Sequence, residues 1–411
     1  MSVSQNVWQA DFKCFSIGSA WYDERMEDRR PAAKGVERRR IFIIGMFDSI
    51  HFVRWLDIFR NEEIDFLLFP SSPHRKIHSG LEELLESPAT ASYRLSRWPS
   101  LSGLPLWLLD RVFLNRLRSL LAVREILSFK PHLMHAVELQ NAGYLASLTY
   151  AKLKSSKPIF LATNYGSDIF WFSRFPRHAK RIRTLLSRLD RYAAECERDV
   201  RLAKTFGFRG QILPVQPNSG GFSEDILSSA LLGPELRGTI LVKGYHGWAG
   251  RAHLALFALE SLQEELQNYE ILIYSCNSST KRLAMRIAKR SRLQIRTYRK
   301  GALSHEEMLS KFSRALVYIG LSRSDGISTS MLEAMALGAI PVQTSTACCD
   351  EWFEGSGVAI ATLDTDEIAK GVRQAINLAL NSDSASKNRE IIRTKASRKE
   401  VSKNALTFYH L

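Results

Sequence analysis

The sequence contains little cysteine and no long apolar run. Its 411 residues include 5 cysteines, an odd number without the spacing of a metal site or a disulfide framework. This scarcity excludes a disulfide-stapled domain and predicts a reducing compartment. No stretch approaches about 18 consecutive apolar residues, so we expect no membrane-spanning helix. Charges of both signs before position 30 do not fit a secretory signal. We therefore expect a cytoplasmic protein.

Acidic residues are outnumbered by basic ones, 42 against 57, which gives a formal net charge of +15. Residues 101–217 hold 19 basic and 8 acidic residues, and so account for 11 of the 15 excess charges. Such a field favours a polyanion, an anionic membrane face or a phosphorylated substrate. The stretch 98–117, rich in arginine and aromatic residues, is typical of a membrane-surface element or of a core helix with a solvated basic face.

The basic charge leads to two expectations about binding partners. An anionic membrane surface is expected as a partner through 98–117 and the basic block 101–217, which would place the protein on the inner face of the cytoplasmic membrane. Nucleic acid is not expected, because no aromatic–basic recognition motif accompanies the charge.

Short apolar runs alternate with amphipathic helical patterns along most of the chain, which predicts an α/β fold with parallel, doubly wound sheets. The segment 216–225, QPNSGGFSED, interrupts the alternation and predicts a domain boundary. We expect an irregular lead-in at 1–38, two Rossmann-like domains at 39–217 and 218–385, and a C-terminal helix within 386–411. The expected strands are 41–44, 64–69, 133–137, 158–163, 211–215, 239–244, 270–275, 294–298, 315–320 and 339–344.

The most informative motif follows the run 315–320. Asp325 is expected on a loop and Glu333 near the start of the next helix, so that both carboxylates reach one cleft at the carboxyl edge of the sheet. Ser328, Thr329 and Ser330 lie between them, where free N–H groups at a helix start can hold a phosphate. The same residues also fit a capping box, with Ser330 at the N-cap and Glu333 at N3.

A glycine-rich loop follows the run 239–244. Gly244 and Gly250 would let the backbone approach a ligand closely. Lys243 and Arg251 bracket the loop, and two cations beside a helix start suit a diphosphate. The loop lacks both the Gly-Lys-Ser/Thr ending of a phosphate-binding loop and the glycine spacing of a dinucleotide site. A tight strand-to-helix turn is the alternative.

The N-terminal half carries a third group of polar residues at strand ends. His135 and Glu138 belong to the segment KPHLMHAVE, and Gly166 and Asp168 belong to TNYGSD. The carboxyl ends of parallel strands share one edge, so His135, Glu138 and Asp168 could meet across one cleft. A satisfied structural histidine is the alternative for His135.

A DxD-type metal motif is present at Asp364–Thr365–Asp366, but it leads directly into a helical pattern. Asp and Thr at such a position are typical helix caps. We therefore expect no metal site and no bound cofactor.

Several of these segments together resemble the family-4 retaining glycosyltransferases of GT-B fold, over about residues 41–380. The hallmark of that family is two acidic residues separated by seven others, here Asp325 and Glu333, with the second in the run MLEAMALGAIP. The loop containing Gly45 and His51, the segments KPHLMHAVE and TNYGSD, and QPNSGG at the domain switch agree in order.

The resemblance implies a GT-B enzyme that moves a sugar from a nucleotide-sugar donor to a saccharide or polyprenyl-linked acceptor with retention, as in cell-surface polysaccharide or lipopolysaccharide synthesis. Glu333 would bind the ribose, Asp325 would face the sugar or its phosphate, and Lys243 and Arg251 would neutralise the diphosphate in place of a metal. The residues implied for catalysis are Asp325, Glu333, His135 and Asp168. Those implied for the acceptor side of the cleft are Gly45, His51, Glu138 and Gly166.

The sequence departs from the family pattern at two positions. Asp325 stands where the family usually has Glu, and Tyr165 stands where many relatives have His. The first departure leaves open a sugar-nucleotide epimerase or hydrolase, or a non-catalytic sugar-nucleotide binder, of the same fold.

Overall fold

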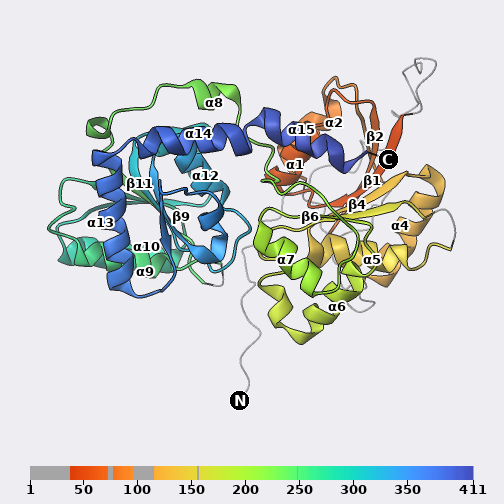
Figure 1. Cartoon of the computed structure of the whole chain (residues 1–411), viewed down its shortest axis with the longest axis horizontal. Helices are drawn as coiled ribbons and strands as arrows, with labels where there is room; N and C mark the ends of the chain where they lie inside the picture. Colours follow the sequence, from red (N-terminus) through yellow and green to blue (C-terminus); the bar gives the residue numbers. More distant parts are fainter. Residues whose placement is uncertain (1–37, 73–76, 97–114, 155–156, 248, 411) are drawn as a thin grey trace, which may run out of the picture. The chain divides into compact units, whose positions relative to one another are not determined.

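The structure is a computed structural model that describes residues 38–72, 77–96, 115–154, 157–247 and 249–410. Within these residues the strands form two fully parallel sheets (Figure 1). The N-terminal sheet has the order β3-β2-β1-β4-β5-β6-β7 and the C-terminal sheet the order β10-β9-β8-β11-β12-β13. The strand order reverses beside β1 in the first sheet and beside β8 in the second. These are the switch points at which doubly wound sheets bind ligands.

The strands of the N-terminal sheet are β1 (Arg39–Gly45), β2 (Ile64–Pro70), β3 (Ser92–Leu95), β4 (Leu133–Val137), β5 (Ile159–Thr163), β6 (Arg191–Ala193) and β7 (Gln211–Ile212). Its helices are α1 (Ile50–Asp57), α2 (Ser79–Glu86), α4 (Arg116–Phe129), α5 (Tyr144–Tyr150), α6 (Pro176–Leu186) and α7 (Glu197–Thr205). Residues 41–45 of β1 and all of β4 are buried, because helices cover both faces of the sheet.

The strands of the C-terminal sheet are β8 (Thr239–Lys243), β9 (Glu270–Cys276), β10 (Gln294–Arg299), β11 (Ala315–Gly320), β12 (Ile340–Thr344) and β13 (Val358–Ile360). Its helices are α8 (Glu224–Ser228), α9 (Ala252–Ser261), α10 (Ser278–Arg290), α11 (His305–Ser313), α12 (Thr329–Ala336), α13 (Thr365–Asn381) and α14 (Ser384–Ala396). Each sheet has its own apolar core on both faces.

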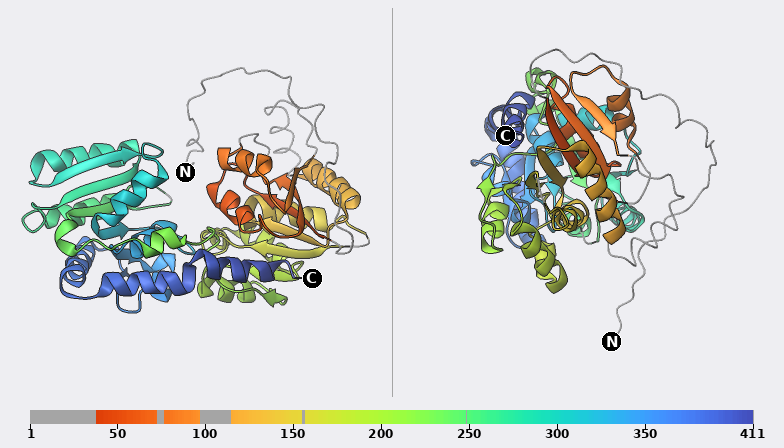
Figure 2. Two further views of the ribbon diagram at one scale, coloured as in Figure 1. Left: turned by 90° about the horizontal axis from the view of Figure 1, so that it is seen from above. Right: turned by 90° about the vertical axis from the view of Figure 1, so that its right-hand side faces the viewer.

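The last helix, α15 (Arg398–Phe408), returns to the N-terminal sheet (Figures 1 and 2). Ala405, Phe408 and Tyr409 are fully buried in the core beside β1 and β2. At the crossing, the segment after β7 pairs with the segment before α15, and the Phe222 N–H donates to the Ala396 carbonyl. Two stretches of chain therefore run side by side between the sheets.

The structure confirms the alternating α/β pattern and differs from the predicted elements in three places. The strand expected at 211–215 has two residues, because Pro214 has no N–H to continue the ladder. The single helix expected within 386–411 is two helices, because Ser397 is extended and caps a new helix at the Glu400 N–H. The short strands β3, β6 and β13 were not predicted.

Two of the expected segments fall largely on residues that the structure does not describe. Of the lead-in expected at 1–38, residues 1–37 lie outside the described residues. Of the stretch 98–117, residues 98–114 lie outside them as well.

Candidate functional site

Loops at the carboxyl ends of both sheets surround a cavity of about 260 Å³. The N-terminal sheet contributes the loops after β1, β4, β5 and β6, and the C-terminal sheet contributes the loop between β11 and α12. Four carboxyl side chains of the described residues reach the cavity. Its lining is Met46, His51, Glu138, Tyr165, Gly166, Ser167, Asp168, Glu195, Asp325, Ile327 and Thr329.

Glu138 and Asp168, both predicted site residues, are held by backbone N–H groups. The Glu138 carboxylate accepts hydrogen bonds from Asn141 N at 2.9 Å and Ala142 N at 3.0 Å. Asp168 Oδ2 accepts from Leu139 N at 2.7 Å and Tyr165 N at 3.0 Å. Burial raises the pKa of Glu138 to about 7, and burial and the nearby Glu138 raise the pKa of Asp168. These bonds fix the two loops against each other at the rim of the cavity.

Glu195 is a cavity residue that the sequence reasoning missed. It follows β6, is 7% exposed, and accepts a hydrogen bond from Asn218 N at 3.1 Å. Burial, with a contribution from Asp325, raises its pKa to about 8. An acidic residue directly after the apolar run YAA was the available signal, but it belonged to no recognised spacing.

Asp325 lies on the loop before α12, as predicted. Its Oδ2 is 3.9 Å from Lys243 Nζ, which is also 3.4 Å from Ser328 Oγ. Burial raises the pKa of Asp325, and the cations Lys243 and Arg198 oppose that shift. Burial would lower the pKa of Lys243, but Tyr318 and Asp325 outweigh it and the net pKa is raised. The lysine is therefore charged beside the acidic loop.

The capping arrangement differs from the expected capping box. Ser328, not Ser330, is the N-cap of α12, and its hydroxyl accepts from Met331 N. Glu333 is therefore at the fifth helical position, two residues further into the helix than expected, and takes no part in the cap. Its side chain is 12% exposed, with Oε1 3.9 Å from His305 Nδ1. Burial raises its pKa to about 7, against the opposing charges of Arg54 and Lys243.

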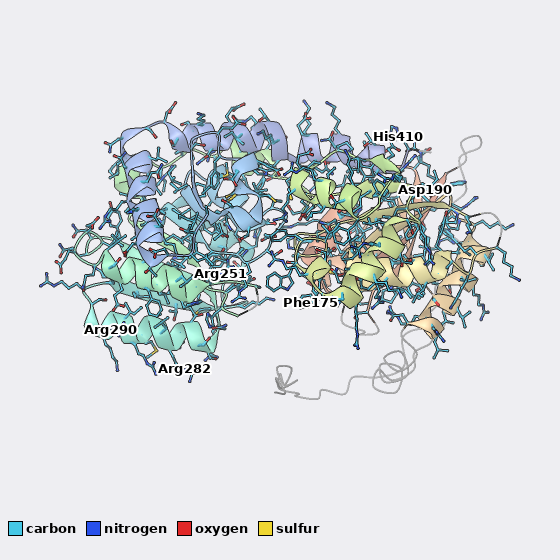
Figure 3. The ribbon with its side chains drawn as sticks, turned by 60° about the horizontal axis from the view of Figure 1, so that its bottom comes forward. Phe175, Asp190, Arg251, Arg282, Arg290 and His410 are labelled. Atoms are coloured by element: carbon cyan, nitrogen blue, oxygen red, sulfur yellow. The ribbon has the colours of Figure 1, made fainter. Side chains whose placement is uncertain are left out.

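The glycine-rich loop after β8 lies beside the acidic loop. A Cβ on Gly244 would be 2.5 Å from the Tyr274 carbonyl, and one on Gly250 would be 2.6 Å from the Tyr245 carbonyl. Both positions therefore require glycine for the local backbone approach. Arg251 lies at the start of α9 and donates to the Ser322 carbonyl at 3.1 Å, whereas Arg282 and Arg290 lie along α10 (Figure 3). Lys243, Arg251 and Ser322 surround one gap that is too small to hold a water molecule.

The loop after β5 touches the acidic loop at a pair of glycines. A Cβ on Gly166 would be 2.7 Å from Asp325 Oδ1 and would also collide with the backbone nitrogen of Gly326. Arg198, in the first turn of α7, donates to the carbonyls of Asp325 at 2.9 Å and Thr346 at 2.7 Å. Its guanidinium also pairs with the buried Asp199 at 2.8 Å. Gly166 and Arg198 thus join the acidic loop to the N-terminal domain.

The other predicted cleft residues divide into two groups. His51, in the first turn of α1, lines the cavity, and burial with Arg54 and Lys243 lowers its pKa to about 4. Gly45 lies at the end of β1, where a Cβ would collide with the ring of Phe52, so it acts in packing.

The expectation that His135 meets Glu138 and Asp168 across the cleft is wrong. His135 is 0% exposed and does not line the cavity. Its Nδ1 is 2.9 Å from the Tyr409 hydroxyl and its Nε2 is 2.7 Å from Thr163 Oγ1. Burial lowers its pKa to about 3, so the ring is neutral. It is a core histidine that packs against α15.

The Asp364–Thr365–Asp366 segment is a helix cap, as expected: Asp364 Oδ1 accepts from Asp366 N at 2.7 Å and from Glu367 N at 3.3 Å. Among the described residues, one group has the proximity of metal ligands, namely Cys196, Cys348 and Glu351. It does not line the cavity. No helix within the described part of the chain is long and apolar enough to cross a membrane.

Comparison with known proteins agrees with this geometry. Residues 234–397 match the family model described as "Glycosyl transferases group 1". A glycosyltransferase from Rickettsia africae has a TM-score of 0.63 at 13% identity, over 91% of this chain and 98% of its own. HepE from Anabaena, in complex with UDP and glucose, has a TM-score of 0.64 at 12% identity, over 90% and 99%.

A third structure, sucrose-phosphate synthase from Thermosynechococcus elongatus, has a TM-score of 0.65 at 12% identity, over 90% of this chain and 98% of its own. No curated protein sequence matches the chain. At these identities the structural likeness shows the fold.

The fold is therefore that of the GT-B glycosyltransferases, with two Rossmann-like domains. The part of it that matches the group 1 glycosyl transferase model, residues 234–397, includes the acidic loop and α12.

Proposed function

We propose that this protein is a retaining glycosyltransferase that moves a sugar from a nucleotide-sugar donor to a saccharide or polyprenyl-linked acceptor. One observation carries the proposal: within residues 234–397, Lys243, Asp325 and Glu333 lie at one sheet edge, beside a cavity that the N-terminal domain completes. The retention and the role in cell-surface polysaccharide or lipopolysaccharide synthesis come from the resemblance to the family-4 enzymes.

The donor is proposed to lie along the C-terminal edge. Glu333, in α12, has the carboxylate that accepts the two vicinal ribose hydroxyls. Lys243 and Arg251 bracket the loop after β8 and are proposed to supply the positive charge for the diphosphate. The N–H groups at the start of α12, near Ser328, Thr329 and Ser330, add further donors.

The sugar of the donor is proposed to occupy the 260 Å³ cavity. Four carboxyl groups line it, from Glu138, Asp168, Glu195 and Asp325. Carboxyl oxygens accept hydrogen bonds from sugar hydroxyls, and a protonated carboxyl also donates one. We therefore propose a sugar that presents hydroxyls to this cavity.

The proposed chemistry breaks the bond between the anomeric carbon and the diphosphate through an oxocarbenium-like transition state. Negative charge grows on the departing phosphate, so Lys243, Arg251 and backbone N–H groups stabilise that charge as it develops. These cations take the place of a metal ion, and we expect turnover to be unaffected by a chelator. Gly166 and Gly326 bring the two domains into contact beside the cavity, and we propose that the domains close further over the donor and exclude water that would hydrolyse it.

A ligand-stabilisation screen tests the donor site. The wild type, Glu333→Ala and the matched control Glu367→Ala are melted with UDP-, GDP-, ADP- and dTDP-sugars. Glu367 is an exposed carboxylate of the same domain, paired with Lys370. A ligand at 100 times its dissociation constant stabilises by about 2.7 kcal/mol. We expect one nucleotide to stabilise the wild type and the control but not Glu333→Ala.

Product analysis then tests the reaction. Transfer to a lipid-linked saccharide with an unchanged anomeric configuration, read by NMR, is expected. Release of free sugar without an acceptor would identify a hydrolase, a changed sugar nucleotide would identify an epimerase, and binding without turnover would identify a non-catalytic binder.

The acceptor is proposed to be presented at an anionic membrane, through a patch that we call the α6 patch: Trp171, Arg174, Phe175, Arg177 and Lys180. The stretch 169–189 has six basic residues and no acidic one. Phe175, at the start of α6, is 46% exposed (Figure 3). An exposed aromatic ring among cations is typical of a surface that enters the headgroup layer.

Co-sedimentation with vesicles tests this surface. The double variant Phe175→Ser/Lys180→Glu is expected to lose binding to vesicles that contain anionic lipid at low salt. Lys289→Glu on α10 is the control, since it makes the same charge change on an exposed helix of the other domain. Equal loss in both variants would contradict a specific role of α6.

A further inference from the structure

Two buried thiols meet where the two domains touch. Cys196 follows β6 and is the N-cap residue of α7, whereas Cys348 lies between β12 and β13. Their Sγ atoms are 2.8 Å apart. Cys196 is fully buried and Cys348 is 5% exposed. No function proposed above uses either residue.

The separation of the two sulfur atoms distinguishes between the roles that such a pair can have. Two thiolates on one tetrahedral zinc ion, each about 2.3 Å from the metal, are about 3.7 Å apart. Non-bonded atoms that only pack together are roughly 3.5–4.0 Å apart. A disulfide is about 2.05 Å long, so a movement of less than about 1 Å would join the two sulfurs. The pair is thus closer to a disulfide than to a metal site.

The surrounding contacts hold the two segments in register. Arg198 donates to the Thr346 carbonyl, two residues before Cys348, at 2.7 Å. On the other side, Glu197 N donates to Glu351 Oε2 at 3.1 Å. Cys348 itself has a φ of 52°, a left-handed conformation that persists only where its surroundings determine it. Bonds from Glu197 and Arg198, directly after Cys196, to residues on both sides of Cys348 therefore fix the approach of the two sulfur atoms.

We propose that Cys196 and Cys348 form a reversible disulfide in the presence of hydrogen peroxide, and that this bond locks the two domains together. The sulfur of Cys348, the more exposed thiol, takes an oxygen from peroxide to become a sulfenic acid, and one water is released. The Cys196 thiol attacks that sulfur, a disulfide forms, and a second water leaves. Two thiols and one peroxide thus give one disulfide and two waters, and a dithiol reductant reverses the step.

The order of the two thiols follows from their surroundings. The hydrogen bond to Cys348 and burial both raise the pKa of Cys196, so this residue is a poor first target for an oxidant. Its Sγ, 2.8 Å from that of Cys348, is within reach of a sulfenic acid formed there.

The regulatory consequence rests on the proposed function. The disulfide would tie the start of α7 to the loop 345–351, and Arg198 in the same turn already holds the carbonyl of Asp325. A donor enters and its nucleotide leaves only when the domains separate, so a covalent link between them stops turnover.

Peptide mapping tests the link without reference to activity. The intact protein is treated with hydrogen peroxide, its remaining thiols are alkylated, and it is digested with trypsin. Cys196 lies in peptide 192–198, and Cys348 and Cys349 share peptide 324–370. We expect these two peptides to be joined and two hydrogens lighter than their sum, and to separate with dithiothreitol. Cys349→Ser is expected to keep the link and Cys348→Ala to lose it.

Each result decides the proposal. No joined peptide in the oxidised wild type, or a link that survives in Cys348→Ala, would overturn the disulfide. In turnover assays, peroxide is expected to reduce activity at least tenfold in the wild type and in Cys349→Ser, reversibly, and to leave Cys348→Ala unaffected. A link without this loss would refute the lock alone. If no sugar nucleotide is turned over by any form, the proposed function fails, and the peptide map still decides whether the disulfide exists.

Discussion

Replacing Gly166 by alanine tests whether the approach of the two domains is needed for activity. The added Cβ would be 2.7 Å from Asp325 Oδ1 and 2.8 Å from Asp325 Cα, where ordinary contacts are 3.4 Å or longer. The neighbour in the way is backbone, which cannot rotate aside. Overpacking of this kind costs about 1–3 kcal/mol, which corresponds to a roughly 5- to 150-fold shift of the closing equilibrium. We expect donor affinity and turnover to fall by that factor.

The matched control is Gly238→Ala. A Cβ there meets nothing within 4 Å. Because the Gly166 collision lies between domains, the unfolding temperature of Gly166→Ala is expected to stay near that of the control, whereas its donor affinity, measured by calorimetry, drops. Wild-type affinity and turnover in Gly166→Ala would refute the reasoning.

Three further predictions concern stability and capping. Burial raises the pKa of Glu195 to about 8, so the folded protein holds a proton that the unfolded chain releases above about pH 4.5, and stability falls as pH rises between these values. Glu195→Gln removes this pH-dependent loss. In urea unfolding, the free energy of unfolding of the variant relative to the wild type is expected to rise by about 2–4 kcal/mol from pH 5 to pH 8; a difference independent of pH would contradict this. Tyr409→Phe leaves the Trp55 Nε1–H and His135 without their shared partner, and we expect a loss of about 2–3 kcal/mol in the same assay, whereas a change below about 0.5 kcal/mol would show that neither bond matters. Asp364→Ala removes a helix cap and is expected to cost about 1 kcal/mol without changing donor binding; a donor affinity that falls and is restored by added Mn²⁺ would instead indicate a metal site.

The fold was predictable because a buried parallel strand corresponds to a continuous run of apolar residues in the sequence. The runs at 41–44 and 239–244 correspond to β1 and β8, the strands beside the two switch points. Strands of three or four residues, such as β6 and β13, carry too little pattern to be recognised. The spacing of Asp325 and Glu333 could be recognised from the sequence because Asp325 lies on one loop and Glu333 lies on the helix that directly follows it.

The rest of the site depends on contacts between distant segments. Glu195 is held at the cavity by a hydrogen bond from the Asn218 N–H, and it lies near Asp325. No local sequence pattern predicts such contacts. For His135 the strand was predictable but the face was not, because the face is decided by Tyr409, 274 residues away. Polar residues at strand ends are thus identifiable from sequence as a group, whereas their individual orientations are not.

The return of α15 to the N-terminal sheet has a consequence for biosynthesis. A ribosome completes the entire C-terminal domain before it reaches Phe408 and Tyr409, yet these two residues are fully buried in the core beside β1 and β2. The first domain to be translated is therefore the last to be finished. Until α15 emerges, Trp55 and His135 face an unfilled apolar groove, and a nascent chain in this state is a natural substrate for chaperones that bind exposed apolar segments.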